Sequence, residues 1–465
     1  MRPPVLESGV VPPVDPAPGS ALESARRKAY LRIIPLVFVS YVIAYIDRTN
    51  VALAQLTMGK DLGFDNDVFS TGFGIFFIGY ILLEWPGALI AERWSARKWV
   101  SRIMITWGII AALTAAVETH RQFYAARFAL GLAEAGFFPA IVVYLRHWFP
   151  KRDRARALAY FIMGAPLAQI VSGPLSTPLL KIGAEETIGG VLVRRPELYG
   201  LEGWQWMYIV WGLPAVVMGV VVLFAMTDRP AQARWLTAEE REALEAQLAR
   251  DRAEVGSARH IGALKAILHP AALLLAAANF AVVIGHYGMD SFLPSILTRW
   301  YGLSLDQVGW VIVPPFVAIL LAQLGVSWSS DRTSERWWHT AVPLLVGATA
   351  LAATPLTRGS LPLTVLAFCV AGAGIRSYLP PFYALLGRLL EGTAAASAIG
   401  LIQTVGNLGG YFGPRIVGKL DVITGSFEGG VYALAASSFL AFLFIMILRQ
   451  IHPEAGRVEH PAARQ

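Results

Sequence analysis

Long runs of apolar residues alternate with short polar stretches along most of the 465-residue chain. Each run extends over roughly 20 residues, the length at which an α-helix crosses a hydrocarbon core of about 30 Å. No water reaches the backbone inside such a core, so each segment must satisfy its own hydrogen bonds as a helix. The pattern therefore predicts an all-α membrane protein with twelve transmembrane helices. We place them at 32–54, 68–91, 100–117, 122–146, 156–180, 206–226, 268–298, 306–328, 339–357, 361–388, 396–420 and 431–449.

The composition agrees with this pattern. Hydrophobic residues make up 55% of the chain and charged residues only 15%, whereas soluble domains carry roughly 25% charge. The single cysteine, Cys369, lies inside an apolar run, which excludes an intramolecular disulfide. The first twenty residues are rich in Pro and Gly and contain no apolar core of the kind found in signal peptides. We therefore expect the first span to act as an uncleaved anchor.

Basic residues concentrate in alternate loops, and this bias predicts the orientation in the membrane. One group precedes span 1, the second lies between spans 2 and 3, and the third lies between spans 4 and 5. In this order the groups are Arg26, Arg27, Lys28 and Arg32; Arg93, Arg97, Lys98 and Arg102; and Lys151, Arg152, Arg154 and Arg156. The opposing loop between spans 1 and 2 carries Asp61, Asp65 and Asp67 instead. Both termini are therefore predicted to lie in the cytoplasm. The same bias explains the net charge of +7, so no nucleic-acid partner is expected.

The spans divide into two related groups of six. A Gly-Pro pair recurs in spans 5 and 11, at 173–174 and 413–414, and an acid–Arg pair follows both span 2 and span 8. Internal repeats of this kind are typical of transporters with a central binding site, although one Gly-Pro pair alone can simply mark a kink. We predict the following units: a disordered tail (1–31), a six-helix bundle (32–226), a linker (227–267), a second bundle (268–449) and a C-terminal tail (450–465). The linker resembles an amphipathic helix at the membrane surface.

Several motifs resemble a known family. The loop Gly87-Ala-Leu-Ile-Ala-Glu-Arg-Trp-Ser-Ala-Arg-Lys98 is similar to the loop motif of the major facilitator superfamily, with Glu92 in place of the usual Asp and Ala96 in place of the usual Gly. Four further stretches resemble its anion:cation symporter family: Tyr45-Ile-Asp-Arg-Thr-Asn50, Arg127-Phe-Ala-Leu-Gly-Leu-Ala-Glu-Ala-Gly-Phe-Phe-Pro139, Ser330-Asp-Arg-Thr-Ser-Glu-Arg336 and Gly406-Asn-Leu-Gly-Gly-Tyr-Phe-Gly-Pro414. The resemblance implies the major facilitator fold in a bacterial inner membrane. It also implies proton-coupled symport of a small organic anion such as a sugar acid, hydroxy acid or aromatic carboxylate.

Ionisable residues inside spans are the strongest functional signal, because a charge at the bilayer centre costs about 3 kcal/mol or more. In span 1, Tyr45 and Arg48 share one helical face, while Asp47 lies about 100° away around the axis. In span 4, Arg127 and Glu134 share a face but lie about 10 Å apart along it. Each must therefore find its partner in another span, in water or in substrate.

These four charges suggest an anion site. Arg48 and Arg127 remain charged and can grip a carboxylate bidentately. Burial disfavours the ionised form of Asp47 and Glu134, whereas a nearby guanidinium favours it, so either acid is a candidate proton carrier. The family resemblance points the same way, since it implies that the two arginines bind substrate and the two acids carry protons. The alternative is that the four are structural ion pairs between helices.

Further candidates come from both bundles. We predict substrate contacts from Asn407, Tyr80, Tyr287 and Gln169, although each residue type also occurs in ordinary helix packing. Arg376 either pairs with Asp290 as a structural lock or binds a second acidic group of the substrate; neither residue belongs to the family pattern. His286 has no second ligand nearby in the sequence, so no metal site is predicted.

The acid–Arg pairs of the two loops are predicted to form a cytoplasmic gate. They are Glu92, Arg93, Asp331 and Arg332. Contacts between acids, arginines and helix ends would hold the two bundles together on the inside while the cavity opens outward. Ordinary surface charge is the alternative interpretation.

Two other functions compete with proton symport. One is anion exchange or uniport on the same fold. The other is a membrane-embedded enzyme or receptor, but the chain has no zinc-ligand spacing, no Gly-x-Ser-x-Gly elbow in a credible setting and no phosphate-binding loop. We therefore predict a transporter and not an enzyme. It should act as a monomer in the lipid bilayer without a cofactor, with a small organic anion and protons as its partners.

Overall fold

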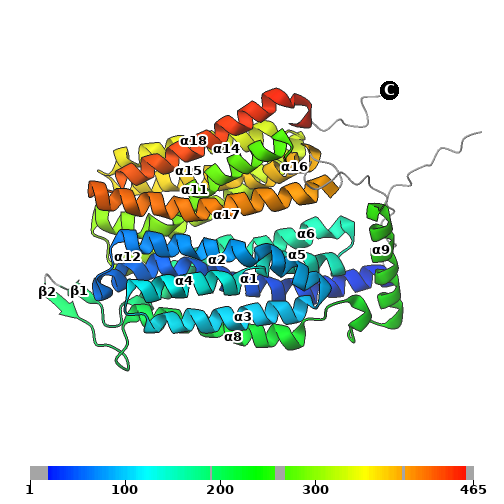
Figure 1. The fold of residues 1–465 in the computed structure, drawn as a ribbon, viewed down its shortest axis with the longest axis horizontal. Helices are drawn as coiled ribbons and strands as arrows, with labels where there is room; N and C mark the ends of the chain where they lie inside the picture. The colour runs from blue at the N-terminus through cyan, green and yellow to red at the C-terminus, as the bar shows by residue number, and fades with distance from the viewer. Residues whose placement is uncertain (1–18, 189–190, 257–267, 390–392, 457–465) are drawn as a thin grey trace, which may run out of the picture.

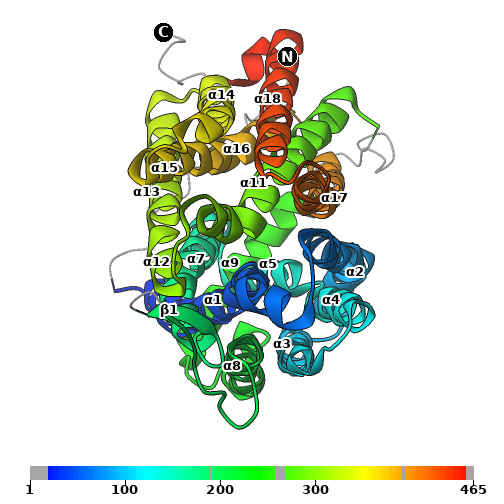
Figure 2. The same cartoon turned by 90° about the vertical axis from the view of Figure 1, so that its left-hand side faces the viewer.

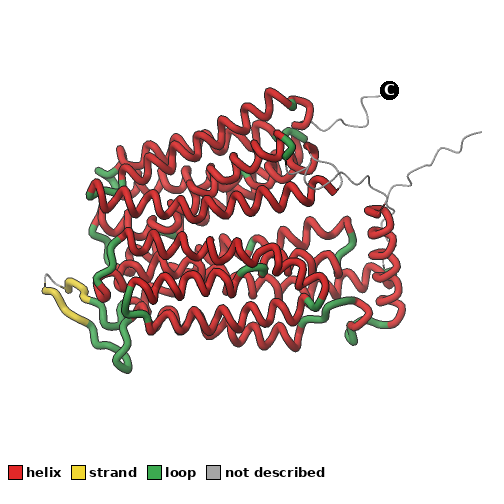
Figure 3. Tube along the Cα trace, viewed as in Figure 1, coloured by secondary structure: helices red, strands yellow, loops and turns green. Residues whose placement is uncertain are grey.

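The computed structural model describes residues 19–188, 191–256, 268–389 and 393–456. Helices dominate this part of the chain, and the strands β1 (Glu185–Ile188) and β2 (Val191–Arg194) pair as one antiparallel hairpin (Figure 3). Eleven helical segments of the described chain are long and apolar enough to span a membrane. The more polar helix α17 (Thr393–Thr424) stands where the sequence predicts the span 396–420, and supplies the twelfth. The predicted all-α membrane fold is confirmed.

The helices form two halves joined by a linker helix (Figure 1). The N-terminal half contains α1 (Ala21–Leu62), α2 (Asn66–Arg93), α3 (Ala96–Leu113), α4 (His120–Glu134), α5 (Phe137–Trp148), α6 (Lys151–Ile162), α7 (Gly164–Leu180) and α8 (Gly203–Ala225). The linker helix is α9 (Ala238–Gly256). The C-terminal half contains α11 (Pro270–Tyr301), α12 (Leu305–Val311), α13 (Val313–Thr333), α14 (Trp337–Ala353), α15 (Leu361–Ser377), α16 (Leu379–Leu389), α17 and α18 (Glu428–Ile451). Short 3₁₀ helices occupy Thr114–Ala116, Pro230–Gln232, Thr354–Thr357 and Pro453–Gly456.

Four predicted spans are each divided into two helices: α4 and α5, α6 and α7, α12 and α13, and α15 and α16. Between α4 and α5 the chain turns at Gly136, whose φ of +84° lies in the left-handed region that favours glycine. A Cβ atom there would come within 2.9 Å of the Cα of Gly87. This position therefore needs glycine both for its backbone conformation and for the close approach of α2.

Helix α1 begins at Ala21, so it extends into the segment 1–31 that the sequence assigns to a tail. The extension contacts α9 and α6, and we call this end of the molecule the linker end. Lys28 and Ser24 donate hydrogen bonds to the Glu240 carboxylate at 2.8 and 2.6 Å. Burial alone would raise the pKa of Glu240, but these hydrogen bonds outweigh it and lower the pKa to about 2. Arg26 grips Asp153 bidentately at 2.5 and 2.7 Å. The contacts with Glu240 fix α9 to α1, and the contact with Asp153 joins α1 to α6.

The opposite end carries the β1–β2 hairpin, and we call it the hairpin end (Figure 2). Here polar side chains join the two halves. Arg415 of α17 donates to Asp67 at 2.5 Å, and Asn66 donates to Asp421 at 2.7 Å. An ion pair between Lys181 and Asp306 adds a second link, from the end of α7 to α12. The halves are therefore held together at the hairpin end.

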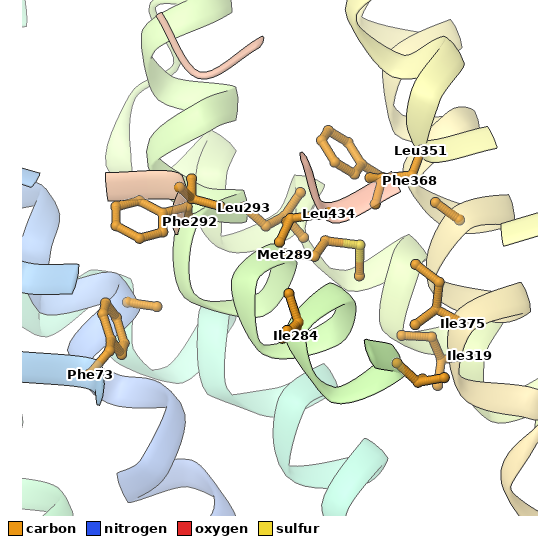
Figure 4. Packing of buried hydrophobic residues seen from close by; sticks show 14 of the residues in the cluster. Phe73, Ile284, Met289, Phe292, Leu293, Ile319, Leu351, Phe368, Ile375 and Leu434 are labelled. Atoms are coloured by element: carbon orange, nitrogen blue, oxygen red, sulfur yellow. The ribbon is translucent and has the colours of Figure 1, made fainter. Parts of the chain in front are cut away.

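Apolar packing continues this contact toward the middle of the molecule. Phe73 of α2 and Phe292 of α11 lie with their ring centroids 5.9 Å apart (Figure 4). Both rings belong to one buried cluster that contains residues of both halves. Apolar packing is therefore continuous across the boundary between the halves, immediately beside the central polar residues.

Helices α2 and α4 pack closely because Gly131 lies in their interface. A Cβ atom on Gly131 would fall onto the carbonyl oxygen of Phe76. We expect Gly131→Val to lower the free energy of unfolding by roughly 1–3 kcal/mol or more, because overpacked helices must move apart. Thermal unfolding in detergent, followed by tryptophan fluorescence, measures the change. Gly325→Val is the matched control, since nothing lies within 4 Å of a Cβ atom there. Equal melting temperatures for the two variants would contradict this packing.

Candidate functional site

A central cavity lies between the two halves. Its walls are formed by residues of α1, α2, α4 and α11. The predicted site residues Tyr45, Arg48, Arg127 and Tyr287 line it, together with Asp290. Residues that lie far apart in the sequence therefore meet at one cavity.

Arg48 forms an ion pair with Glu134, which joins α1 to α4. The Glu134 side chain is 2% exposed and its second oxygen has no partner among the described residues. The Arg48 guanidinium also lies over the rings of Tyr45 and Tyr80, at 5.5 and 5.3 Å from the centroids. Glu134 is too far from Arg127 along α4 to pair with it, and its partner is Arg48 of α1.

Arg127 is buried without a carboxylate partner among the described residues. It is 2% exposed, and its Nε donates to the carbonyl oxygen of Gly72 at 3.3 Å. Its Nη1 has no hydrogen-bond partner in the described structure, and the guanidinium carbon lies 4.9 Å from the ring centroid of Phe76. A buried, unpaired cation is costly unless something else neutralises it. Arg127 therefore has the character of an anion ligand.

Asp47 faces a different neighbour from the other three charges. Trp107 of α3 donates its indole N–H to Asp47 Oδ2 at 2.9 Å. The other carboxylate oxygen, Oδ1, is buried without a described partner, and the residue is 1% exposed. The structure places Asp47 behind the cavity wall, one residue along α1 from Arg48.

Arg376 and Asp290 form an ion pair between α15 and α11. Gln169 of α7 joins them from the opposite half: its Nε2 donates to Asp290 Oδ2 at 3.0 Å, and its Oε1 accepts from Arg376 Nη1 at 3.3 Å. Gln169 and Asp290 also line an adjoining cavity. The predicted pairing is present, and it includes a residue of the N-terminal half.

Asn407 contacts Glu84, which is not among the predicted site residues. Its amide donates to Glu84 Oε2 at 2.9 Å, which connects α17 to α2 across the two halves. No ion pair to Glu84 is found in the described part of the chain. The signal was present in the sequence, because Glu84 is an acid inside the predicted span 68–91.

The four predicted gate residues do not meet across the halves in the described structure. Glu92 Oε1 lies 3.5 Å from Nε2 of His147 in the same half. Asp331 pairs with Arg336 at 2.7 Å, again within one half. At the linker end, Glu92 and Asp331 thus contact residues of their own half.

Comparison with known proteins gives a consistent result. The family model described as the Major Facilitator Superfamily matches residues 37–300 and again residues 275–464. A protein of Agrobacterium vitis named "Putative tartrate transporter" is 40% identical over 443 residues, covering 94% of each chain. A Pseudomonas putida protein named "Putative metabolite transport protein NicT" is 35% identical, covering 90% of this chain and 92% of that one.

Among solved structures, a bacterial homologue of the lysosomal transporter Spinster, in an inward-facing and unoccupied conformation, has the same fold. The TM-score is 0.71 at 17% identity, and the match covers 93% of this chain and 97% of the other.

Proposed function

Because the chain belongs to the Major Facilitator Superfamily and is a transporter rather than an enzyme, we propose that it carries a small organic anion across the membrane together with protons. The observation that carries this proposal is the buried Arg127, which has no carboxylate partner among the described residues and lines the central cavity. A carboxylate entering the cavity would give this guanidinium its missing counter-ion.

The contact between Arg48 and Glu134 supports the proposed proton coupling. An arriving carboxylate would compete with Glu134 for the Arg48 guanidinium. A buried Glu134 that loses its cation is more stable with a proton bound, so anion binding and proton binding favour one another. Asp47, one residue from Arg48 and held by Trp107, is the second proposed proton carrier.

The named relatives support an organic acid as substrate, since one is called a tartrate transporter. Hydroxy acids, sugar acids and aromatic carboxylates are the classes to examine. Purified protein in proteoliposomes should show saturable uptake of at least one of these acids and no uptake of the corresponding neutral sugars. Uptake of neutral sugars at the same rate, or of none of these compounds, would contradict the proposed anion site.

We propose that the linker end faces the cytoplasm of a bacterium and the hairpin end faces outward, as the distribution of basic residues favours. Both termini then lie inside. With this orientation the cross-half contacts of Arg415, Asn66 and Lys181 seal the outside, and the disengaged gate residues fit a state open to the cytoplasm. Glu92, Arg93, Asp331 and Arg332 would engage in the outward-open state.

Removal of the outer seal tests this assignment. We expect Arg415→Ala to expose the cavity to the outside, because it removes the cross-half contact with Asp67. In a Cys369→Ser background, a cysteine at Thr49 in the cavity wall should react several-fold faster with a membrane-impermeant thiol reagent added outside. Arg358→Ala is the control, because Arg358 pairs with Glu428 within one half. Equal labelling rates in the two variants would contradict the proposed seal.

A further inference from the structure

We propose that Glu84 is a third proton-binding site, which receives the coupling proton from Glu134 and releases it at the linker end. Glu84 belongs to α2 and accepts a hydrogen bond from Asn407 of α17, so it lies where the two halves meet. It would thus complete the proton-coupled transport proposed above, on which this inference rests.

Glu84 lies at the boundary between the packed and the separated parts of α2 and α17. Toward the hairpin end the two helices touch, since a Cβ atom on Gly410 would come within 2.6 Å of the Phe77 ring. The hydrogen bond between Asn407 and Glu84 follows in the direction of the linker end. Farther along α17, nothing in the described structure lies within 4 Å of a Cβ atom on Gly400. Glu84 is therefore placed where the contact between the halves opens toward the linker end.

No cation neutralises Glu84 by direct contact within the described chain. Asn407 is neutral and donates from Nδ2 to Oε2 of Glu84 at 2.9 Å. The charged or titratable side chains that act on Glu84 electrostatically are Arg48 of α1, Tyr80 of α2 and Tyr383 of α16. Of these only Arg48 is a cation, and it already has a carboxylate partner. Because an unpaired carboxylate in a membrane span is costly, Glu84 is a favourable place for a proton.

Asn407 is a suitable partner for an acid that changes its protonation state. An asparagine amide offers both N–H donors and a carbonyl acceptor. It donates to the Glu84 carboxylate in the structure, and with its amide turned it could accept from the protonated carboxyl. An arginine in its place would instead hold the acid in the ionised form. The contact can therefore persist while the proton binds and leaves.

Tyr80 connects Glu84 with the central cavity. It lies four residues before Glu84 and hence on the same face of α2. Its ring centroid is 5.3 Å from the guanidinium carbon of Arg48, which lines the cavity and pairs with Glu134. Helix α2 runs from here toward the linker end. Glu84 is half-buried, whereas the Glu134 side chain is 2% exposed, so Glu84 is the more accessible of the two acids.

The proposed transfer conserves protons and charge. The proton leaves the Glu134 carboxyl and binds to the Glu84 carboxylate. Glu134, now ionised, pairs with Arg48 as in the structure. Glu84 then gives the proton to water at the linker end and becomes ionised again. The release of the proton thereby restores the ion pair that an arriving anion must displace, which makes the return to the empty state favourable.

A packing contact between helices explains Glu84 less well. A glutamine at this position would offer Asn407 the same carbonyl acceptor without placing an ionisable group in a span. Intramembrane amides commonly join neighbouring helices in this way. The carboxyl group adds one property that an amide lacks, which is the ability to bind and release a proton.

Two rates measured in proteoliposomes test this role, with the organic acid that the wild type takes up fastest as the probe and tartrate examined first. One is net uptake driven by an inward proton gradient, and the other is exchange against internal acid. We expect Glu84→Gln to lower the ratio of net uptake to exchange by roughly tenfold or more, because exchange requires no release of the proton. Glu84→Asp keeps a titratable carboxyl and should keep the ratio within about threefold of the wild type.

Two further variants separate a proton site from a packing contact. Asn407→Ala removes the hydrogen bond but leaves the acid, so it should lower both rates and change their ratio by less than about threefold. Glu118→Gln, at an exposed position, is the control and should change neither rate. A packing contact predicts the reverse order, with a wild-type ratio in Glu84→Gln because glutamine keeps the size and the acceptor.

An unchanged ratio in Glu84→Gln would overturn the proposed proton site. An equal fall of net uptake and exchange in this variant would overturn it as well, since damage to the fold affects both rates alike. In either case the wild type would still respond to the gradient, and the proposed transport would stand. Wild-type uptake that ignores the gradient would reject proton coupling together with this site, and uptake of no organic anion would reject the transport itself.

Discussion

Arg127→Ala is expected to abolish uptake of the organic anion while the protein still folds and inserts into the membrane. Charge-assisted hydrogen bonds contribute about 1.5–3 kcal/mol each, so losing a bidentate contact should reduce uptake by on the order of 100-fold or more. Folding should survive because Arg127 pairs with no described carboxylate. Its removal breaks no ion pair among the described residues, since Glu134 pairs with Arg48.

The measurement is uptake by proteoliposomes that contain equal amounts of correctly folded protein, judged by gel filtration and melting temperature. Arg121→Ala provides the matched control, since Arg121 lies on the same helix but is exposed. Its uptake should equal that of the wild type. Wild-type uptake by Arg127→Ala would remove the basis of the proposed anion site.

Glu134→Gln should separate anion movement from the proton gradient. Glutamine keeps the size of the side chain but can neither pair with Arg48 as an ion nor exchange a proton. We expect net uptake to lose its acceleration by an inward proton gradient, by roughly tenfold or more. Exchange of external for internal anion should persist, because it needs no change in protonation.

The two activities can be measured in the same vesicles, with and without internal anion. Glu118→Gln is the control: Glu118 is exposed in the loop before α4 and should be replaceable without effect on either activity. If Glu134→Gln kept the full response to the proton gradient, the coupling proton would have to bind elsewhere. Asp47 would then be the next residue to substitute.

The transmembrane helices were predictable because hydrophobicity is a property of each segment and needs no knowledge of its neighbours. The breaks inside them were not. Gly136 interrupts the predicted span 122–146 with a left-handed backbone, yet glycine also occurs within unbroken helices of this chain, such as Gly131. The β1–β2 hairpin was missed for a similar reason, because its strands are only four residues long.

The candidate site was predictable as a set of residues but not as a set of contacts. A charge inside an apolar span identifies Arg48 and Glu134 singly, whereas their pairing depends on how α1 packs against α4. Trp107 as the partner of Asp47 had no sequence signal at all, since a tryptophan in a span is ordinary. Glu84 has a sequence signal of its own as an acid inside the predicted span 68–91, whereas its contact with Asn407 of the other half depends on how α2 packs against α17.

Uptake under an imposed proton gradient tests the central claim most directly. Proteoliposomes without internal anion, placed in an acidic medium with labelled tartrate, should accumulate it above the external concentration, and a protonophore should abolish the accumulation. Uptake that requires internal anion and ignores the gradient would instead identify an exchanger. Uptake that stops at equal concentrations with or without the gradient would identify a uniporter, and either result would contradict proton-coupled symport.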